Sequence, residues 1–109
     1  MNVLITGAAS PLGQKIVAEL ASNHQLRLLD NTIPDIKYEN FEFIQGSLVD
    51  PSIVSEATQN IDVLIHTGEP PPNPPQDPLE CEQLLLDLAT RGTHGLFKTA
   101  VDMGIKRFI

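Results

Sequence analysis

Residues 3–13 read VLITGAASPLG, a pattern typical of a strand that turns sharply into a helix. Its first residues form an apolar run typical of a buried strand. Gly7 follows where the chain must turn tightly, in a conformation that only a residue without Cβ adopts cheaply. Ser10 and Pro11 are typical of an N-cap and a first helical residue, so a helix is predicted to begin at about Pro11. Gly13 lies one turn into that helix, where a side chain would push the helix away from the sheet.

The start of this helix suits an anion. Its unpaired N–H groups and the positive end of its dipole face whatever lies beyond the strand, and a pyrophosphate fits there. An alternative interpretation is a tight strand-to-helix turn that holds no ligand, because short glycine motifs also occur without one. Apolar residues recur along the helix at a spacing that lays one face on a sheet, namely Leu12, Ile16, Val17 and Leu20.

A second strand-like run begins at Gln25 and ends in an acid, Asp30. A carboxylate at that strand end is placed to accept hydrogen bonds from the ribose hydroxyls of a dinucleotide. No Arg or Lys lies between Asp30 and Lys37 to neutralise the 2′-phosphate of NADP, so the sequence predicts NAD as the cofactor. The alternative is that Asp30 is a solvated turn residue before Asn31 and Thr32.

The residues around this turn resemble the Thr-Gly-x-x-Gly-x-x-Gly pattern of the extended short-chain dehydrogenase/reductases, especially the NAD-dependent epimerase/dehydratase group. Thr6, Gly7 and Gly13 match the pattern, and Ser10 stands where the middle glycine is expected. In the family that glycine lets the backbone approach the pyrophosphate. The resemblance therefore implies that the Cβ of Ser10 loosens the contact, while its hydroxyl offers a replacement hydrogen bond.

The resemblance continues beyond the second strand. After a third predicted strand at residues 41–45, the run GSLVD at residues 46–50 is similar to the family's Gly-Asp-Leu-x-Asp, whose second and third residues contact the adenine. This implies adenine contacts at Ser47 and Leu48, of which the backbone and Leu48 contacts carry over because Ser47 replaces the usual Asp. The following Asp-Pro pair predicts a short helix from residue 51 to about residue 58.

A fourth predicted strand covers residues 61–66 and ends in His66, Thr67 and Gly68. This segment is similar to the family's His-Leu-Ala-Ala, which lies beside the nicotinamide ribose, and Thr67 and Gly68 are small enough to leave room for a cofactor. His66 has no second ligand or triad partner nearby in the sequence, so a structural role is expected for it and not a catalytic one.

The segment from Leu84 to Ile109 resembles the family's long helix and next strand. Gly104 is expected to end the helix. The strand predicted from Ile105 onward would form an exposed edge, which predicts marginal stability or self-association, for example as a homodimer. A helical stripe is predicted from Leu84, Leu88, Leu96, Ala100 and Val101, with Phe97 and Met103 as packing residues.

Composition limits the class of protein. The 109 residues, 41% of them hydrophobic, can bury one modest core, so a single domain is expected. A net charge of -7 disfavours nucleic-acid and anionic-membrane partners. One cysteine, Cys81, allows no internal disulfide and favours a reducing cytoplasm, and no export or membrane segment is recognised. His24 and His94 lack neighbouring metal ligands, so no metal site is predicted.

A proline-rich segment at residues 69–78 joins the fourth strand to the long helix. A rigid connector is the favoured interpretation, because the segment lies between two elements. The alternative is a polyproline II stretch that binds an aromatic groove or frames the mouth of the site.

Together these elements predict an α/β fold, a Rossmann-like doubly wound parallel sheet in three α/β/α layers with strand order 3-2-1-4-5. Residues 1–109 would form the N-terminal, truncated part of an NAD-binding domain, with the substrate domain absent. The ligand crevice is expected at the carboxyl ends of the strands, near the reversal between the first and fourth. The predicted cofactor-binding residues are Gly7, Ser10, Pro11, Leu12, Gly13, Asp30, Asn31, Ser47, Leu48, His66, Thr67 and Gly68.

The family's catalytic Ser or Thr and its Tyr-x-x-x-Lys have no counterpart here, so no catalytic residue is predicted and no turnover is expected. The only tyrosine, Tyr38, has no lysine at the needed spacing and precedes the third strand. One hypothesis is that the chain is part of a longer NAD-dependent enzyme acting on a nucleotide sugar or a related hydroxyl-bearing substrate. The other is a naturally short, non-catalytic NAD-binding module or a degenerate relic. A native mass several times 11.9 kDa would support the first, and a matching mass the second.

Overall fold

The computed structural model describes residues 1–35, 41–67 and 73–109. In these residues five strands form one sheet in the order β3-β2-β1-β4-β5, and every neighbouring pair is parallel. The predicted strand order is therefore confirmed. The strands are β1 (Asn2–Thr6), β2 (Gln25–Asp30), β3 (Phe41–Gln45), β4 (Val63–His66) and β5 (Arg107–Phe108).

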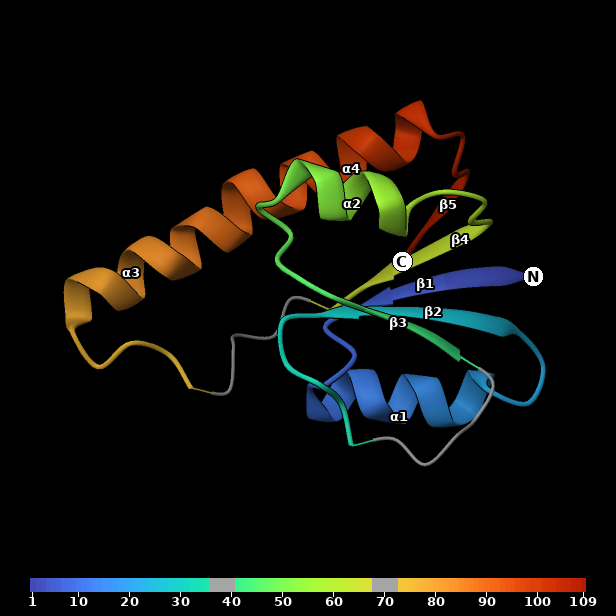
Figure 1. Ribbon diagram of the computed structural model, residues 1–109, viewed down its shortest axis with the longest axis horizontal. Coiled ribbons are helices and arrows are strands. Elements are labelled where there is room, and N and C mark those ends of the chain that lie inside the picture. The colour runs from blue at the N-terminus through green and yellow to red at the C-terminus, as the bar shows by residue number, and fades with distance from the viewer. Residues whose placement is uncertain (36–40, 68–72) are drawn as a thin grey trace.

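Helices cover both faces of the sheet, which confirms the three-layer arrangement. Figure 1 shows α1 on one face and α2 with α4 on the other, while α3 extends past the carboxyl ends of the strands. A π-helical turn joins α3 to α4 without a loop. The helical elements are α1 (Pro11–Leu20), α2 (Pro51–Ala57), α3 (Pro78–Asp87), the π turn (Leu88–Gly92) and α4 (Thr93–Asp102).

The core is divided by the sheet because side chains alternate between its two faces. On β1, Leu4 packs toward α2 and α4, and its neighbours Val3 and Ile5 pack toward α1. Leu64 and Leu96 belong to the same cluster as Leu4, and both are fully buried. The last residues of β1 and β4 share the face of Leu4 and Leu64, which directs their side chains toward α4.

Several predicted positions need correction. The long helix begins at Pro78, the last residue of the predicted connector, because Asp77 caps it by accepting a hydrogen bond from the Glu80 N–H at 3.1 Å. Val101 is 62% exposed and lies outside the predicted stripe, since residues 100 and 101 are 100° apart on a helix. Leu12, 47% exposed, does not pack on the sheet either, because it lies at the first turn of α1 beyond the strand ends.

The fifth strand is short but its pairing extends past Phe108. The Ile109 N–H donates to Leu64 O and the His66 N–H donates to Ile109 O, both at 2.9 Å. Gly104 ends α4 as predicted, with a left-handed φ of +86° that glycine adopts without strain. Ile109 itself is 75% exposed.

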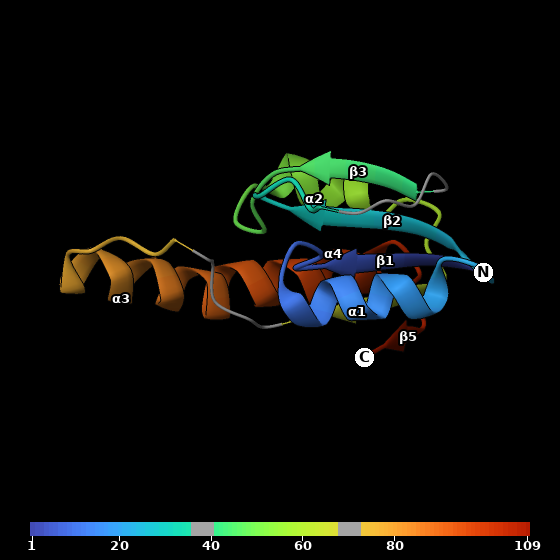
Figure 2. The same ribbon diagram turned by 90° about the horizontal axis from the view of Figure 1, so that it is seen from below.

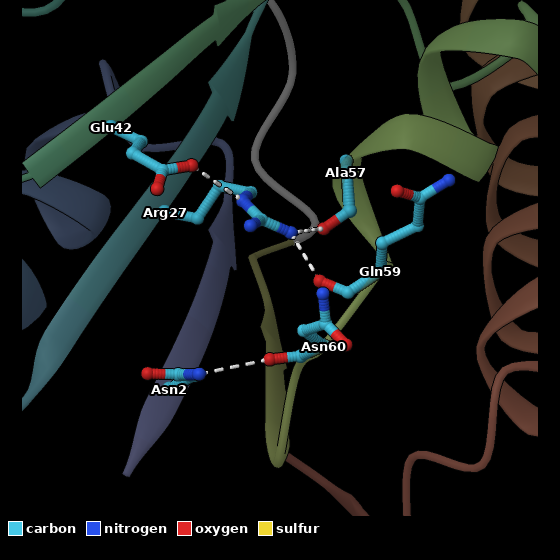
Figure 3. A network of polar contacts seen from close by, with 6 residues as sticks. All are labelled: Asn2, Arg27, Glu42, Ala57, Gln59 and Asn60. Carbon is cyan, nitrogen blue, oxygen red and sulfur yellow. Dashed lines mark hydrogen bonds and ion pairs between the residues drawn. The ribbon is translucent and has the colours of Figure 1, made fainter.

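A polar network ties the amino-terminal half of the sheet to α2 (Figure 3). The Arg27 guanidinium donates to Ala57 O at 3.0 Å and to Gln59 O at 2.6 Å, and it pairs with Glu42 at 3.0 Å. It therefore binds carbonyls that the end of α2 leaves without helical partners. Asn2 donates to Asn60 O at 3.0 Å beside this contact.

No helix in residues 1–35, 41–67 and 73–109 is long and apolar enough to cross a membrane.

Candidate functional site

The glycine turn after β1 is held tightly at the centre of the sheet edge. Gly7 has a φ of +69°, and its N–H donates to Leu29 O at 3.0 Å. A Cβ at Gly7 would fall on Thr67 Oγ1, far inside van der Waals contact. The Thr67 hydroxyl closes this turn by donating to Thr6 O at 2.9 Å. Both the backbone conformation and the close approach of Thr67 therefore require glycine at position 7.

Gly13 is also required, for a reason different from the predicted one. A Cβ there would overlap the carbonyl oxygen of Gly7 and press on the Ala8 backbone, within the turn itself. The absent side chain thus lets α1 begin directly over the glycine turn. The sequence predicts that Gly13 lets α1 approach the sheet. In the structure Gly13 instead lets α1 approach the glycine turn.

The Ser10 hydroxyl both donates and accepts a hydrogen bond inside the protein. It donates to Gly7 O at 2.7 Å and accepts from the Gly13 N–H at 3.0 Å, which confirms Ser10 as the N-cap of α1. A hydroxyl has one proton to donate. It therefore offers no free donor in this arrangement, contrary to the expected replacement hydrogen bond.

The first turn of α1 keeps one free donor. Pro11 has no N–H, and Gly13 gives its N–H to Ser10. The Leu12 N–H has no acceptor among the described residues. An anion at this helix end would therefore meet the Leu12 N–H, with the exposed Leu12 side chain beside it.

Asp30 lies against the glycine turn. One carboxylate oxygen accepts from the Ala9 N–H and the other from the Thr32 N–H, each at 2.9 Å. The carboxylate ends β2 and joins it to the loop that leads into α1, so the predicted acid and the predicted glycine turn are brought together. Asn31 is exposed next to it, and its carbonyl accepts from Gln45 Nε2 at 3.2 Å.

Ser47 and Leu48 lie on the loop between β3 and α2. The Ser47 hydroxyl accepts from the Val49 N–H at 3.3 Å, and Leu48 packs against the core cluster under α4. A Cβ added at Gly92 of the π turn would lie 3.2 Å from the Leu48 Cβ. This loop is thus in contact with the π turn, which the sequence did not indicate.

His66 ends β4 and lies beside Thr6 of β1. Its Nδ1 is 2.6 Å from Thr6 Oγ1, and its Nε2 is 3.2 Å from Thr93 Oγ1. The ring also makes an edge contact with Phe97, with centroids 5.8 Å apart. Burial lowers the pKa of His66 below its usual value, so the ring is neutral at pH 7. Both ring nitrogens are engaged within the protein, as expected for a structural histidine.

Most of the predicted site residues gather at the carboxyl ends of β1, β2 and β4. Gly68 lies outside the described residues, as does Tyr38. Sequence reasoning missed Ala9 as the partner of Asp30 and Thr93 as the partner of His66. A polar residue at the start of an apolar helix was the available signal for Thr93. A shallow hollow at the opposite edge, lined by Met1 and His24 among others, contains none of the predicted residues.

Solved structures share this architecture. The chain resembles a short-chain dehydrogenase/reductase superfamily protein of Agrobacterium tumefaciens, solved with bound NAD, at a TM-score of 0.84 and 25% identity over 99% of this chain and 31% of that one. It also resembles uronate dehydrogenase of the same organism, at a TM-score of 0.73 and 28% identity over 98% of this chain and 38% of that one. The Rossmann-like fold is confirmed.

The chain belongs to the 3-beta hydroxysteroid dehydrogenase/isomerase family, whose sequence pattern matches residues 4–109. This match confirms the resemblance to the extended short-chain dehydrogenase/reductases. The NAD-dependent glucose-6-phosphate dehydrogenase of Haloferax volcanii is 30% identical to the chain over 113 residues. That alignment covers 97% of this chain and 40% of the relative, so the chain spans well under half of the relative's length.

Proposed function

We propose that the chain is the NAD-binding N-terminal part of an NAD-dependent oxidoreductase. The observation that carries the proposal is the Asp30 carboxylate, bound 2.9 Å from the Ala9 N–H of the glycine turn. Each carboxylate oxygen has about two acceptor sites. The bonds to Ala9 and Thr32 use one on each oxygen, which leaves one on each for the two hydroxyls of a ribose.

The neighbouring groups fit the rest of a dinucleotide. The Leu12 N–H and the positive end of the α1 dipole would hold the pyrophosphate beside Asp30. We assign adenine contacts to Ser47 and Leu48, on the β3 side of that position. The nicotinamide ribose would lie near His66, Thr67 and Gly68, at the end of β4.

The relatives support a carbohydrate substrate for the whole protein. Two similar proteins are a glucose-6-phosphate dehydrogenase and a uronate dehydrogenase, which favours a sugar hydroxyl. The narrower assignment to a nucleotide sugar rests on the resemblance to the epimerase/dehydratase group. NAD supplies the hydride acceptor for such a reaction. The single cysteine supports a cytoplasmic location. Offering the full native chain a hexose phosphate, a nucleotide sugar and a 3β-hydroxysteroid in parallel distinguishes a sugar substrate from a steroid substrate.

NAD and NADP titrations followed by calorimetry test the assignment of Asp30. A charge-assisted hydrogen bond contributes about 1.5–3 kcal/mol, so Asp30→Asn should weaken NAD binding by about ten-fold or more. The same variant should narrow the preference for NAD over NADP, because the 2′-phosphate no longer meets a negative charge.

Glu19→Gln is the matched control, since it removes one negative charge from the exposed far end of α1. It should leave both affinities nearly unchanged. Equal NAD affinity for Asp30→Asn and the unaltered chain would contradict the assignment of the ribose to Asp30. A chain that binds neither dinucleotide would contradict the proposed function.

A further inference from the structure

A chain of hydrogen bonds joins the carboxyl ends of two strands to the π turn. Thr6 Oγ1 lies 2.6 Å from His66 Nδ1, and His66 Nε2 lies 3.2 Å from Thr93 Oγ1. Thr93 Oγ1 in turn lies 3.1 Å from Leu88 O, the first carbonyl of the turn. These hydrogen bonds therefore extend from the centre of the sheet into the helical layer of α4.

The direction of every bond in this chain is fixed by its last member. Leu88 O can only accept, so the single hydroxyl proton of Thr93 is donated to it. Thr93 Oγ1 must then accept from His66 Nε2–H, which leaves Nδ1 unprotonated as the acceptor for the Thr6 hydroxyl. Thr93 thereby selects one tautomer of His66 and one orientation of its ring.

The same residue anchors the π turn. The Thr93 N–H also donates to Leu88 O, so backbone and side chain close the turn on one carbonyl. The turn presents Gly92 to Leu48, with only 3.2 Å between a Cβ built on Gly92 and the Leu48 Cβ. Short π segments within helices often occur at functional sites. Here Gly92 of the turn contacts the loop after β3, and the next residue, Thr93, contacts the end of β4.

We propose that Thr93 is a positioning residue of the dinucleotide site, which fixes the end of β4 relative to the glycine turn through His66. This inference rests on the proposed NAD-binding function. Thr93 acts through His66 and has no assigned contact with the ligand. The hydrogen bonds from Thr93 reach the end of β4 through His66. Their loss should therefore weaken binding of the nicotinamide half of NAD and spare the adenosine half, which depends on Asp30.

The test compares Thr93→Val, Thr93→Ser and Thr90→Val in the full native chain. Valine removes the hydroxyl and keeps the branched shape, and serine restores the hydroxyl. Thr90 is the matched control, because it lies in the π turn just before Thr93 and its hydroxyl donates to Leu86 O at 2.7 Å without reaching His66. The measurements are the dissociation constants of NAD and AMP and the 15N chemical shifts of the His66 ring.

Loss of one net hydrogen bond predicts a NAD affinity about three- to ten-fold lower for Thr93→Val. AMP affinity should change less than about two-fold, and the 15N shifts should show a loss of the Nε2–H tautomer. Thr93→Ser should restore both properties, and Thr90→Val should change neither. These readouts separate positioning from a general loss of stability.

Three outcomes would overturn the role of Thr93 in a chain that binds NAD. One is equal NAD affinity for Thr93→Val and Thr90→Val, the second is an equal loss of AMP and NAD affinity, and the third is an unchanged tautomer in Thr93→Val. If the unaltered chain binds no NAD, the proposed function is wrong and the inferred role of Thr93 is wrong with it.

Discussion

Ser10 satisfies the start of α1 with its own side chain. By bridging Gly7 O and the Gly13 N–H, its hydroxyl gives the turn a fixed shape before any ligand binds. The same bond removes the Gly13 N–H from the donors available to a phosphate. Ser10 thus stabilises the turn but leaves fewer N–H groups available to the ligand.

Replacing Ser10 with glycine should therefore tighten NAD binding. Ser10→Gly frees the Gly13 N–H and removes the Cβ from the turn, at a cost of only a few tenths of a kcal/mol in capping. One added hydrogen bond to a charged phosphate predicts an affinity at least about three-fold higher, measured by calorimetric titration.

Ser10→Ala separates the two effects, because it frees the same N–H but keeps the Cβ. It should destabilise the chain by about 1 kcal/mol through loss of the cap. An affinity gain in both variants would assign the effect to the hydroxyl, and a gain in glycine alone would assign it to the Cβ. Unchanged or weaker NAD binding in both would contradict the competition between Ser10 and the phosphate.

At the scale of elements, a side-chain cap followed by proline marks the starts of α1, α2 and α3. Ser10-Pro11, Asp50-Pro51 and Asp77-Pro78 each combine an oxygen acceptor with a residue that needs no N–H partner. At Asp50, hydrogen bonds from Ser52 lower the pKa of the carboxyl group. The pairs at Ser10 and Asp50 predict helices from the sequence alone. The pair at Asp77 follows several prolines, and these prolines favour a connector over a helix start.

Local signals of this kind explain why strands and most helix starts could be predicted. The limits of β2 and β3 match the sequence prediction, since each is a short run bounded by polar residues. The π turn could not be predicted, because its extra residue is accommodated by contacts distant in sequence, between Thr93 and His66 and between Gly92 and Leu48. The pairing of Asp30 with Ala9 likewise depends on how the loops meet at the sheet edge.

Arg27 links elements at the other end of the sheet, and its two kinds of partner should differ in energy. Glu42 is 71% exposed, and an exposed ion pair contributes at most about 1 kcal/mol. The bonds from the half-buried guanidinium to Ala57 O and Gln59 O are charge-assisted, and such bonds contribute about 1.5–3 kcal/mol. The carbonyls at the end of α2 should therefore be the important partners.

Urea denaturation of two variants tests this ranking. Arg27→Met keeps an apolar stem and removes the donors, so the free energy of unfolding should fall by about 1.5–3 kcal/mol. Glu42→Gln keeps those donors in place and should lower the free energy by less than about 1 kcal/mol. Equal losses in the two variants would show that the ion pair, and not the capping of α2, is the main contribution.

At the scale of the molecule, the candidate site lies where the strand order reverses between β1 and β4. Parallel sheets bind ligands at that point, because the adjacent loops leave the sheet toward opposite faces. The site could be located from sequence for this reason alone, once the strands were identified. Its internal contacts required the structure, since Thr6, His66 and Thr93 come from three separate segments.

The molecule carries a net negative charge and also exposes apolar side chains. The net charge of -7 opposes contact between copies. Two regions favour it. Within the described residues β5 pairs only with β4, and Figure 2 shows it at one side of the sheet, opposite β3. In addition, α3 buries none of its residues, and Leu79 and Leu86 are each more than 60% exposed.

We therefore expect the polypeptide of residues 1–109 to self-associate through β5. An exposed strand edge with apolar side chains pairs readily with another edge. Sedimentation velocity over about a hundred-fold range of concentration should show association that strengthens with added salt, which screens the negative charge. Ile109→Lys, at the 75% exposed end of this edge, should suppress the association.

Ile33→Lys is the matched control, because Ile33 is 69% exposed but follows β2 on a different part of the surface. If both lysine variants suppress association equally, exposed apolar surface in general and not the β5 edge controls it, and a chain that stays monomeric throughout would contradict the expectation altogether.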